Sequence, residues 1–131
     1  MFKMDMHIHT SQSSPCGNIP AEQIVKSYKE QGYDGLVITD HYYDGFFNRL
    51  GDIPWTQKVE RFLRGYNVAK TEGDRIGLAV FLGMEIRFED GYNDYLVYGL
   101  EQEFLLNHPE LYKLTLHHFK AMTEQNNMMI F

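Results

Sequence analysis

Three short segments of the sequence, residues 5–10, 38–41 and 83–86, each combine a buried-strand pattern with side chains that bind metal ions. They contribute a His-x-His pair, a third histidine and a glutamate: His7, His9, His41 and Glu85. A site built from imidazoles and a carboxylate suits Zn, Mn or Fe. Such a site points to one chemistry, in which a metal-activated water attacks an electrophilic centre such as a phosphate ester.

The spacing of His7 and His9 predicts that both imidazoles reach the same metal ion. Side chains two residues apart on a strand point to the same face. Asp5 shares that face, and we expect it to accept a hydrogen bond from an imidazole N–H and so orient the ring. Polar residues on a solvated strand face would give the same pattern, so the pair is informative mainly together with the other two segments.

His41 and Glu85 each end a run of apolar residues. In parallel α/β folds, ligands bind at the carboxyl ends of strands. A glutamate that follows Leu-Ala-Val-Phe-Leu is costly to bury unless it is paired or metal-bound, and its two oxygens allow it to bridge two ions. We expect Asp40 to be a hydrogen-bonded support. The predicted catalytic and metal-binding residues are therefore His7, His9, His41 and Glu85.

The composition describes one small acidic domain. The chain has 131 residues, 44% of them hydrophobic, and a formal net charge of −6. This length allows a single domain, and the acidic balance argues against broad nucleic-acid binding, which needs a basic face. The single cysteine excludes an intrachain disulfide framework, and no apolar run approaches the length of a membrane span. We therefore expect a cytoplasmic protein without a signal peptide or membrane contact.

The hydrophobic pattern predicts alternating strands and helices. Strands are expected over residues 2–9, 35–40, 78–85, 95–100 and 128–131. Helices are expected over residues 20–31, 55–73 and 107–125, the first two ending at Gly32 and Gly73. The intervening residues 42–54 resemble an aromatic-rich loop, whose rings either wall a pocket or pack beneath the loop. Alternation of this kind indicates an α/β fold with parallel strands and right-handed crossover helices.

The predicted last strand has no helix after it to cover its far face. A closed eight-stranded α/β barrel takes about 250 residues, and this sequence stops about halfway. We therefore expect the chain to be the first half of a larger barrel.

In order and type, the segments DMHIHT, ITDH and GMEI resemble the first three motifs of the polymerase-and-histidinol-phosphatase (PHP) superfamily of metal-dependent phosphoesterases. The resemblance runs from residue 4 to residue 131. It implies the first half of a distorted (β/α)7 barrel, with two or three divalent ions at the carboxyl ends of its strands and a small phosphate ester as substrate. His7 and His9 would hold one ion, His41 another, and Glu85 would bridge.

The resemblance leaves two further ligands open. Family members often carry a His or Asp in the loop after the first motif, where this sequence offers only Cys16, either as a ligand or as a small turn residue. At the end of the fourth strand we expect Glu101 to bind metal, with Asp94 at the strand's other end as the second choice. The family's later motifs, a His-Pro pair and an Asp-x-His, fall beyond residue 131, so the domain over 1–131 is expected to be truncated.

The sequence therefore predicts a metal-dependent phosphoesterase. The alternative is a non-catalytic truncated fragment with partial metal binding, which depends on a homo-oligomer or a complementing chain to cover its last strand. A proofreading or regulatory domain of a DNA polymerase is a third possibility, and the acidic composition argues against it.

Overall fold

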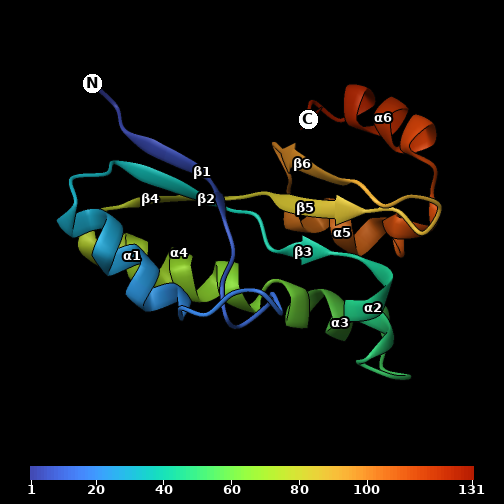
Figure 1. Ribbon diagram of the computed structural model, residues 1–131, viewed down its shortest axis with the longest axis horizontal. Coiled ribbons are helices and arrows are strands. Elements are labelled where there is room, and N and C mark those ends of the chain that lie inside the picture. The colour runs from blue at the N-terminus through green and yellow to red at the C-terminus, as the bar shows by residue number, and fades with distance from the viewer.

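Seven strands and six helices make up the structure, a computed structural model that describes every residue from Met1 to Phe131 (Figure 1). The strands are β1 (Met4–Ile8), β2 (Gly35–Ile38), β3 (His41–Tyr42), β4 (Ala79–Leu82), β5 (Met84–Arg87), β6 (Asp94–Tyr98) and β7 (Met129–Ile130). The helices are α1 (Ala21–Glu30), α2 (Asp44–Asn48), α3 (Trp55–Phe62), α4 (Arg64–Ile76), α5 (Gln102–Asn107) and α6 (Leu116–Gln125), with a 3-10 turn at Leu111–Lys113.

The first sheet is parallel throughout and has the strand order β1-β2-β4. Helix α1 connects β1 to β2, and both α1 and α4 lie on one side of this sheet (Figure 1). Their apolar side chains form a buried cluster with the sheet that includes Val25, Leu36 and Ala69. The structure therefore confirms the predicted fold class, α/β with parallel strands and crossover helices.

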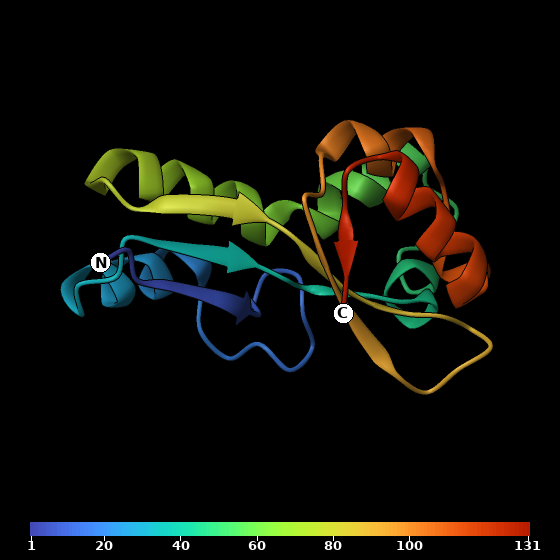
Figure 2. The same ribbon diagram turned by 90° about the horizontal axis from the view of Figure 1, so that it is seen from above.

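Two strands pass from the first sheet into a second sheet, whose order is β3-β5-β6-β7. Strand β2 leads into β3 and β4 leads into β5, as the turned view shows (Figure 2). Gly83 is the one residue between β4 and β5. Backbone pairing continues across the junction, because Gly83 N–H donates to the Ile38 carbonyl at 2.8 Å. A Cβ at Gly83 would lie 2.8 Å from the Val97 carbonyl oxygen, so the close approach of β6 requires glycine.

Strands β6 and β7 differ from the parallel arrangement. Strand β6 pairs antiparallel with β5, and β7 pairs antiparallel with β6. The connection between β5 and β6, residues 88–93, is too short for a parallel crossover, which takes a dozen or more residues. A hairpin is therefore the only pairing that this turn allows between the two neighbouring strands.

The helix expected over residues 55–73 is two helices with a break at Leu63, and it ends later than predicted. Gly77 is the C-cap, in the left-handed conformation with φ 79°. Gly73 serves packing instead, because a Cβ there would lie 2.6 Å from the Leu78 carbonyl oxygen. The prediction mistook a glycine that lets helix α4 approach β4 for the glycine that ends the helix.

The helix expected over residues 107–125 was also placed too early. Asn107 ends α5, and α6 begins only after Thr115, whose hydroxyl caps the helix by accepting a hydrogen bond from His118 N–H at 3.2 Å. Pro109 lies in the connection between them. The N-cap threonine, and not the proline, marks the start of α6.

The aromatic segment after β3 is mainly core. Tyr42 and Phe47 are fully buried and pack with Phe62 and Tyr112 in the cluster beneath the second sheet. Of the two alternatives predicted for the aromatic rings of residues 42–54, packing beneath the loop is therefore confirmed for Tyr42 and Phe47, whereas Tyr43 lines a cavity. No helix in the structure has the length and apolar character needed to cross a membrane.

Candidate metal centre

Strand β1 brings His7 and His9 to the junction of the two sheets. The β1–β2 register is interrupted between Asp5 and Ile8, where β1 has one more residue than its partner. Beyond this bulge Ile8 points into the core at 6% exposure, and the two imidazoles lie on the other side with ring centroids 5.0 Å apart. The predicted pairing of His7 and His9 on one face is therefore confirmed.

Glu85 is the centre of the cluster. Its Oε2 lies 2.6 Å from His9 Nε2, 3.1 Å from His7 Nε2 and 3.6 Å from His41 Nδ1. The glutamate side chain is only 12% exposed. The three predicted imidazoles thus converge on one oxygen of the fourth predicted residue, Glu85, although the roles of these residues in catalysis and metal binding remain predictions.

The pairing of β3 with β5 places His41 beside Glu85, because the two residues are direct register partners in a parallel pair. Burial lowers the pKa of the His41 imidazole below its usual range, and the neighbouring His9 lowers that pKa further, while Glu85 opposes the shift. The neutral imidazole is therefore favoured, and this is the form that binds metal ions.

Asp40 supports the site through hydrogen bonds, as predicted. Its carboxylate accepts from Thr10 N–H at 2.6 Å, from the Thr10 hydroxyl at 2.8 Å and from the Ser14 hydroxyl at 2.6 Å. The Ser14 oxygen in turn accepts a hydrogen bond from His41 N–H at 3.0 Å. Asp40 is 2% exposed, and burial raises the pKa of its carboxyl group. This network ties the loop after β1 to the strand end that carries His41.

Asp5 does not orient an imidazole ring, contrary to expectation. Its Oδ1 accepts from His7 backbone N–H at 3.0 Å, and its Oδ2 accepts from the Tyr28 hydroxyl at 2.7 Å. The bulge in β1 leaves backbone groups without a ladder partner, and such groups need another hydrogen bond. Asp5 supplies the acceptor for one such group, the His7 backbone N–H, and thereby fixes the backbone that carries His7.

The structure does not bring Glu101 to the cluster. Glu101 follows β6 and lines a separate cavity with Lys70 and Phe81. Asp94, at the start of β6, instead lies within metal-sharing distance of His41 and Glu85, with ligand atoms within 4.8 Å of one another. Because β6 runs antiparallel to β5, its first residue and not its end lies near the carboxyl ends of β3 and β5.

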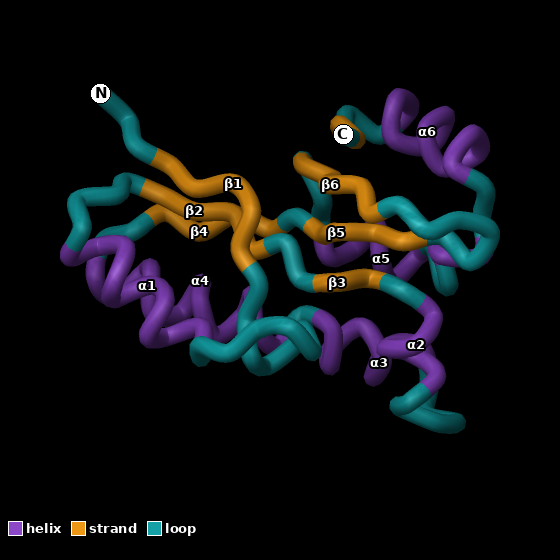
Figure 3. Tube along the Cα trace, viewed as in Figure 1, coloured by secondary structure: helices purple, strands orange, loops and turns teal.

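Cys16 is within reach of the cluster. Its Sγ lies 3.0 Å from His9 Nδ1, and the ligand atoms of Cys16, His9 and His41 lie within 4.8 Å of one another. The loop that carries Cys16 runs past the junction of α3 and α4 (Figure 3), where Ser13 Oγ accepts from Gly65 N–H at 3.0 Å. Both the ligand and the turn alternatives for Cys16 remain predictions.

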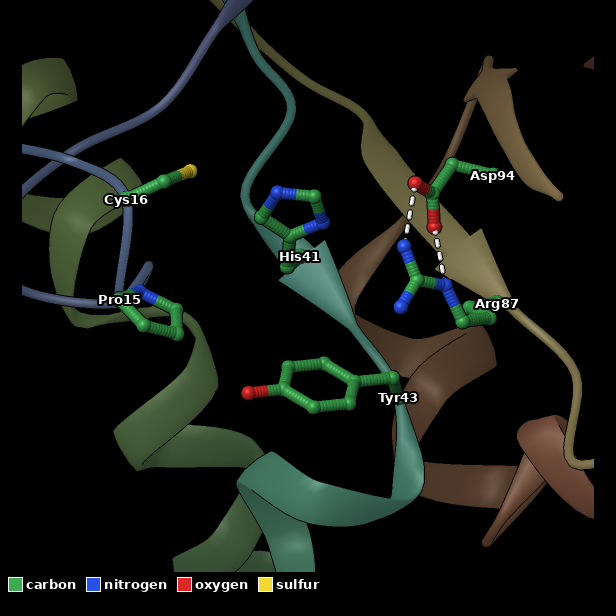
Figure 4. Close-up of a pocket in the computed structure, with 6 residues that line it drawn as sticks. All are labelled: Pro15, Cys16, His41, Tyr43, Arg87 and Asp94. Carbon is green, nitrogen blue, oxygen red and sulfur yellow. Dashed lines mark hydrogen bonds and ion pairs between the residues drawn. The ribbon is translucent and has the colours of Figure 1, made fainter. Parts of the chain in front are cut away.

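One face of the second sheet carries a further polar residue, Arg87, that the sequence analysis did not assign to a site. Arg87 is two residues beyond Glu85 on β5, and its register partner is Asp94. With Tyr43, these residues line a cavity of about 190 Å³ that also contains His41 (Figure 4). The alternation Glu85-x-Arg87 was the available signal, because residues two apart on a strand share a face.

The donor set fits a divalent metal ion. The buried His9 Nε2 has no hydrogen bond of good geometry, even though Glu85 Oε2 is 2.6 Å away. Ligand atoms that share one tetrahedral ion lie roughly 3.4 Å apart, and the separations from Glu85 Oε2 to the three imidazoles lie on both sides of this value. An ion among these atoms would give the orphaned imidazole nitrogen a partner and separate the crowded polar atoms.

A comparison with protein-family models matches residues 5–129 to the PHP domain. No curated protein sequence matches the chain. Among solved structures, a two-domain protein from Bacteroides vulgatus, described as containing a predicted PHP-like metal-dependent phosphoesterase, is 18% identical with a TM-score of 0.69. The match covers 99% of this chain and 34% of that one, so this chain spans about a third of its length. This likeness shows a shared fold.

Two other solved structures are similar over a smaller part of the chain. A candidate metal-dependent phosphoesterase from Bifidobacterium adolescentis is 23% identical, with a TM-score of 0.48, over 73% of this chain and 27% of that one. An amidohydrolase from Chromobacterium violaceum, solved with sulfate and no metal, is 18% identical, with a TM-score of 0.48, over 72% of this chain and 26% of that one.

Proposed function

The chain belongs to the PHP domain family, and from this premise we propose that it provides the metal-binding residues of a phosphoesterase that hydrolyses a small phosphate ester. The observation that carries the proposal is the convergence of three imidazoles on the Glu85 carboxylate. One of them, His9, has a buried Nε2 that lacks a hydrogen bond of good geometry. The donor types suit divalent ions such as Zn, Mn or Fe, and we propose that a complete site holds two or three of them.

Four side chains would hold the ions: His7, His9, His41 and Glu85. A bound divalent ion supplies two effects, a water with a pKa lowered to about 7 and a positive charge opposite the phosphoryl oxygens. Asp94 is within reach of the same site and is a further candidate ligand.

The protein contributes positioning and charge. The neutral His41 imidazole presents a free lone pair, since burial lowers its pKa. Asp40 holds both the Thr10–Ser14 loop and, through Ser14, the His41 backbone, so the imidazoles stay aimed at Glu85. Glu85 is nearly buried, which strengthens its electrostatic interaction with any cation beside it.

The first test is metal uptake by protein stripped with a chelator and titrated with Zn or Mn. We expect wild-type protein to bind metal, and His9→Ala and Glu85→Gln to bind it at least roughly tenfold more weakly. His117→Ala is the matched control, because His117 lies exposed on α6 outside the cluster. A wild-type protein that takes up neither ion would rule out the proposal.

The second test is hydrolysis of an aryl phosphate by the metal-loaded protein. Turnover that is lost in His9→Ala and retained in His117→Ala supports the phosphoesterase. Metal uptake without turnover supports the alternative, a metal-binding unit that needs a homo-oligomer or a complementing chain for hydrolysis. Measuring the molecular mass of the same sample in solution separates these two forms of the alternative.

A further inference from the structure

We propose that Arg87 binds the phosphoryl group of the substrate through the edge of its guanidinium that Asp94 leaves free, and that it selects phosphate monoesters. The inference rests on the proposed phosphoesterase function and deepens it by naming a substrate class and the residue that recognises it. It concerns the cavity that Arg87 lines together with His41, a proposed metal ligand, and Asp94, a further candidate ligand.

Asp94 fixes the guanidinium along one edge. Arg87 Nε donates to Asp94 Oδ1 at 2.8 Å, and Arg87 Nη2 donates to Asp94 Oδ2 at 2.7 Å (Figure 4). A guanidinium has five N–H groups in one plane, so one N–H on Nη2 and two on Nη1 remain. The outer edge of the fork therefore stays available for a second oxyanion, and such forks match the oxygens of a phosphate group.

The free edge lies beside the proposed metal centre. Arg87 is the only cationic residue among those that line the cavity of about 190 Å³, and His41 lines the same cavity. Glu85 is two residues before Arg87 on the same face of β5. A phosphoryl group in this cavity can direct one oxygen toward the imidazole cluster while two others accept from Arg87.

This division of oxygens favours monoesters. The phosphoryl group of a monoester has three non-bridging oxygens, enough for both the Arg87 fork and the metal centre. A diester has only two, so it would leave one of these partners unmatched. The Tyr43 ring and Pro15 provide the less polar part of the cavity wall, against which the alcohol portion of the ester can pack (Figure 4).

The Arg87–Asp94 pair has an alternative role as a cross-strand staple of the β5–β6 hairpin. The side chains are 46% and 24% exposed, so solvent screens the pair. Its bidentate geometry makes it stronger than most exposed ion pairs, but it remains a small part of the stability of the fold. Arg87→Gln should therefore fold. A purely structural role predicts that the substitution changes thermal stability slightly and leaves the affinity for phosphate unchanged.

The test is a calorimetric titration of inorganic phosphate into metal-free and Mn-loaded protein. We expect Arg87→Gln to weaken phosphate binding by roughly 10- to 100-fold, as loss of hydrogen bonds to a charged group does. Arg87→Lys should recover only part of the affinity, because an ammonium group cannot donate as a fork. The matched control is Arg75→Gln, since Arg75 forms an exposed guanidinium–carboxylate pair with Glu72 on α4.

Kinetics give a second reading. Arg87→Gln should raise the KM for an aryl monophosphate by a similar factor, with a smaller change in kcat, and wild-type protein should prefer that monoester to a bis-aryl phosphate. Equal phosphate affinity in wild type and Arg87→Gln overturns the assignment, as does a wild-type protein that binds no phosphate. Equal turnover of monoester and diester overturns the selectivity.

The metal titration distinguishes failure of this inference from failure of the proposed function. Metal uptake and turnover that are unaffected by Arg87→Gln would rule out the role of Arg87 and leave the proposed phosphoesterase function standing. Phosphate binding that depends on Arg87 in a protein that takes up no metal would support the role of Arg87 and rule out the proposed phosphoesterase function.

Discussion

Asp40 and Thr10 are joined by two hydrogen bonds, from the Thr10 backbone N–H at 2.6 Å and from its hydroxyl at 2.8 Å to the Asp40 carboxylate. Thr10 directly follows His9, and Asp40 directly precedes His41. The contact therefore links the two strand ends that carry imidazoles of the candidate site. Both residues are essentially buried. The site geometry therefore depends on a polar contact in which neither residue is itself placed as a metal ligand.

Removing the Asp40 carboxylate should destabilise the fold. Asp40→Ala leaves three buried donors unpaired, two on Thr10 and one on Ser14. We expect the free energy of unfolding to fall by about 3 kcal/mol, measured by urea denaturation. Asp40→Asn should lose less because an acceptor oxygen remains, and Asp52→Ala, at an exposed position, should change little. An unchanged urea midpoint for Asp40→Ala would contradict the supporting role.

Gly65→Ala should also lower stability, although alanine is the better helix former by about 1 kcal/mol. A Cβ at Gly65 would lie 1.9 Å from Thr10 Oγ1 and 2.7 Å from Asp40 Oδ2. Helix α4 and the loop after β1 would have to separate, at a cost of about 1–3 kcal/mol. Thermal unfolding tests this against Gly91→Ala, where a Cβ meets nothing within 4 Å. A more stable Gly65→Ala would show that helix propensity dominates.

Thr39→Val should loosen the strand that carries the His-x-His pair. Thr39 Oγ1 accepts from Ile8 N–H at 3.0 Å and lies 3.2 Å from the Ile8 carbonyl oxygen, so one hydroxyl serves both backbone groups. Valine has nearly the same shape and neither function. We expect a loss of about 1–3 kcal/mol in unfolding free energy, together with weaker metal uptake.

The control for Thr39→Val is Thr71→Val, because the Thr71 hydroxyl bonds its own helix at an exposed position. That variant should retain wild-type stability and metal uptake. If Thr39→Val instead matches wild type in both measurements, the hydroxyl does not hold β1 in place.

Tyr28 should give the protein a distinct alkaline dependence. Burial, followed by the hydrogen bond to Asp5, raises the pKa of the Tyr28 phenol to about 12 from the ordinary 10.0. A group whose pKa is higher in the folded state contributes stability that is complete below pH 10.0 and is lost as the pH rises through about 12. We therefore expect unfolding free energy to decline over this window.

Comparison of variants isolates the Tyr28 contribution. Tyr28→Phe should remove its part of the decline and of the late tyrosinate absorbance change. Tyr92→Phe is the control, since Tyr92 is 96% exposed and should leave the decline intact. Identical alkaline profiles for Tyr28→Phe and wild type would show that the phenol titrates normally.

The local pattern of the sequence was sufficient to place the main site residues. Each of His7, His9, His41 and Glu85 follows or ends a run with strand periodicity. The pairs β1–β2, β2–β4 and β3–β5 are all parallel, so the segments that carry these residues meet at the junction of the two sheets. Periodicity is a property of the chain itself, and with the parallel pairing expected of alternating strands and helices it was enough to predict that these side chains lie close together.

The remaining features depended on contacts between distant segments. Asp94 and not Glu101 reaches the cluster because β6 runs antiparallel, a consequence of the short hairpin turn. Gly73 packs against β4 while Gly77 ends the helix, although both are glycines near the same predicted boundary. Arg87 acquires its place beside His41 only when the second sheet forms. The sequence by itself determined which segments carry the candidate ligands, whereas pairing direction and close packing, which are set by partners far along the chain, decided what surrounds them.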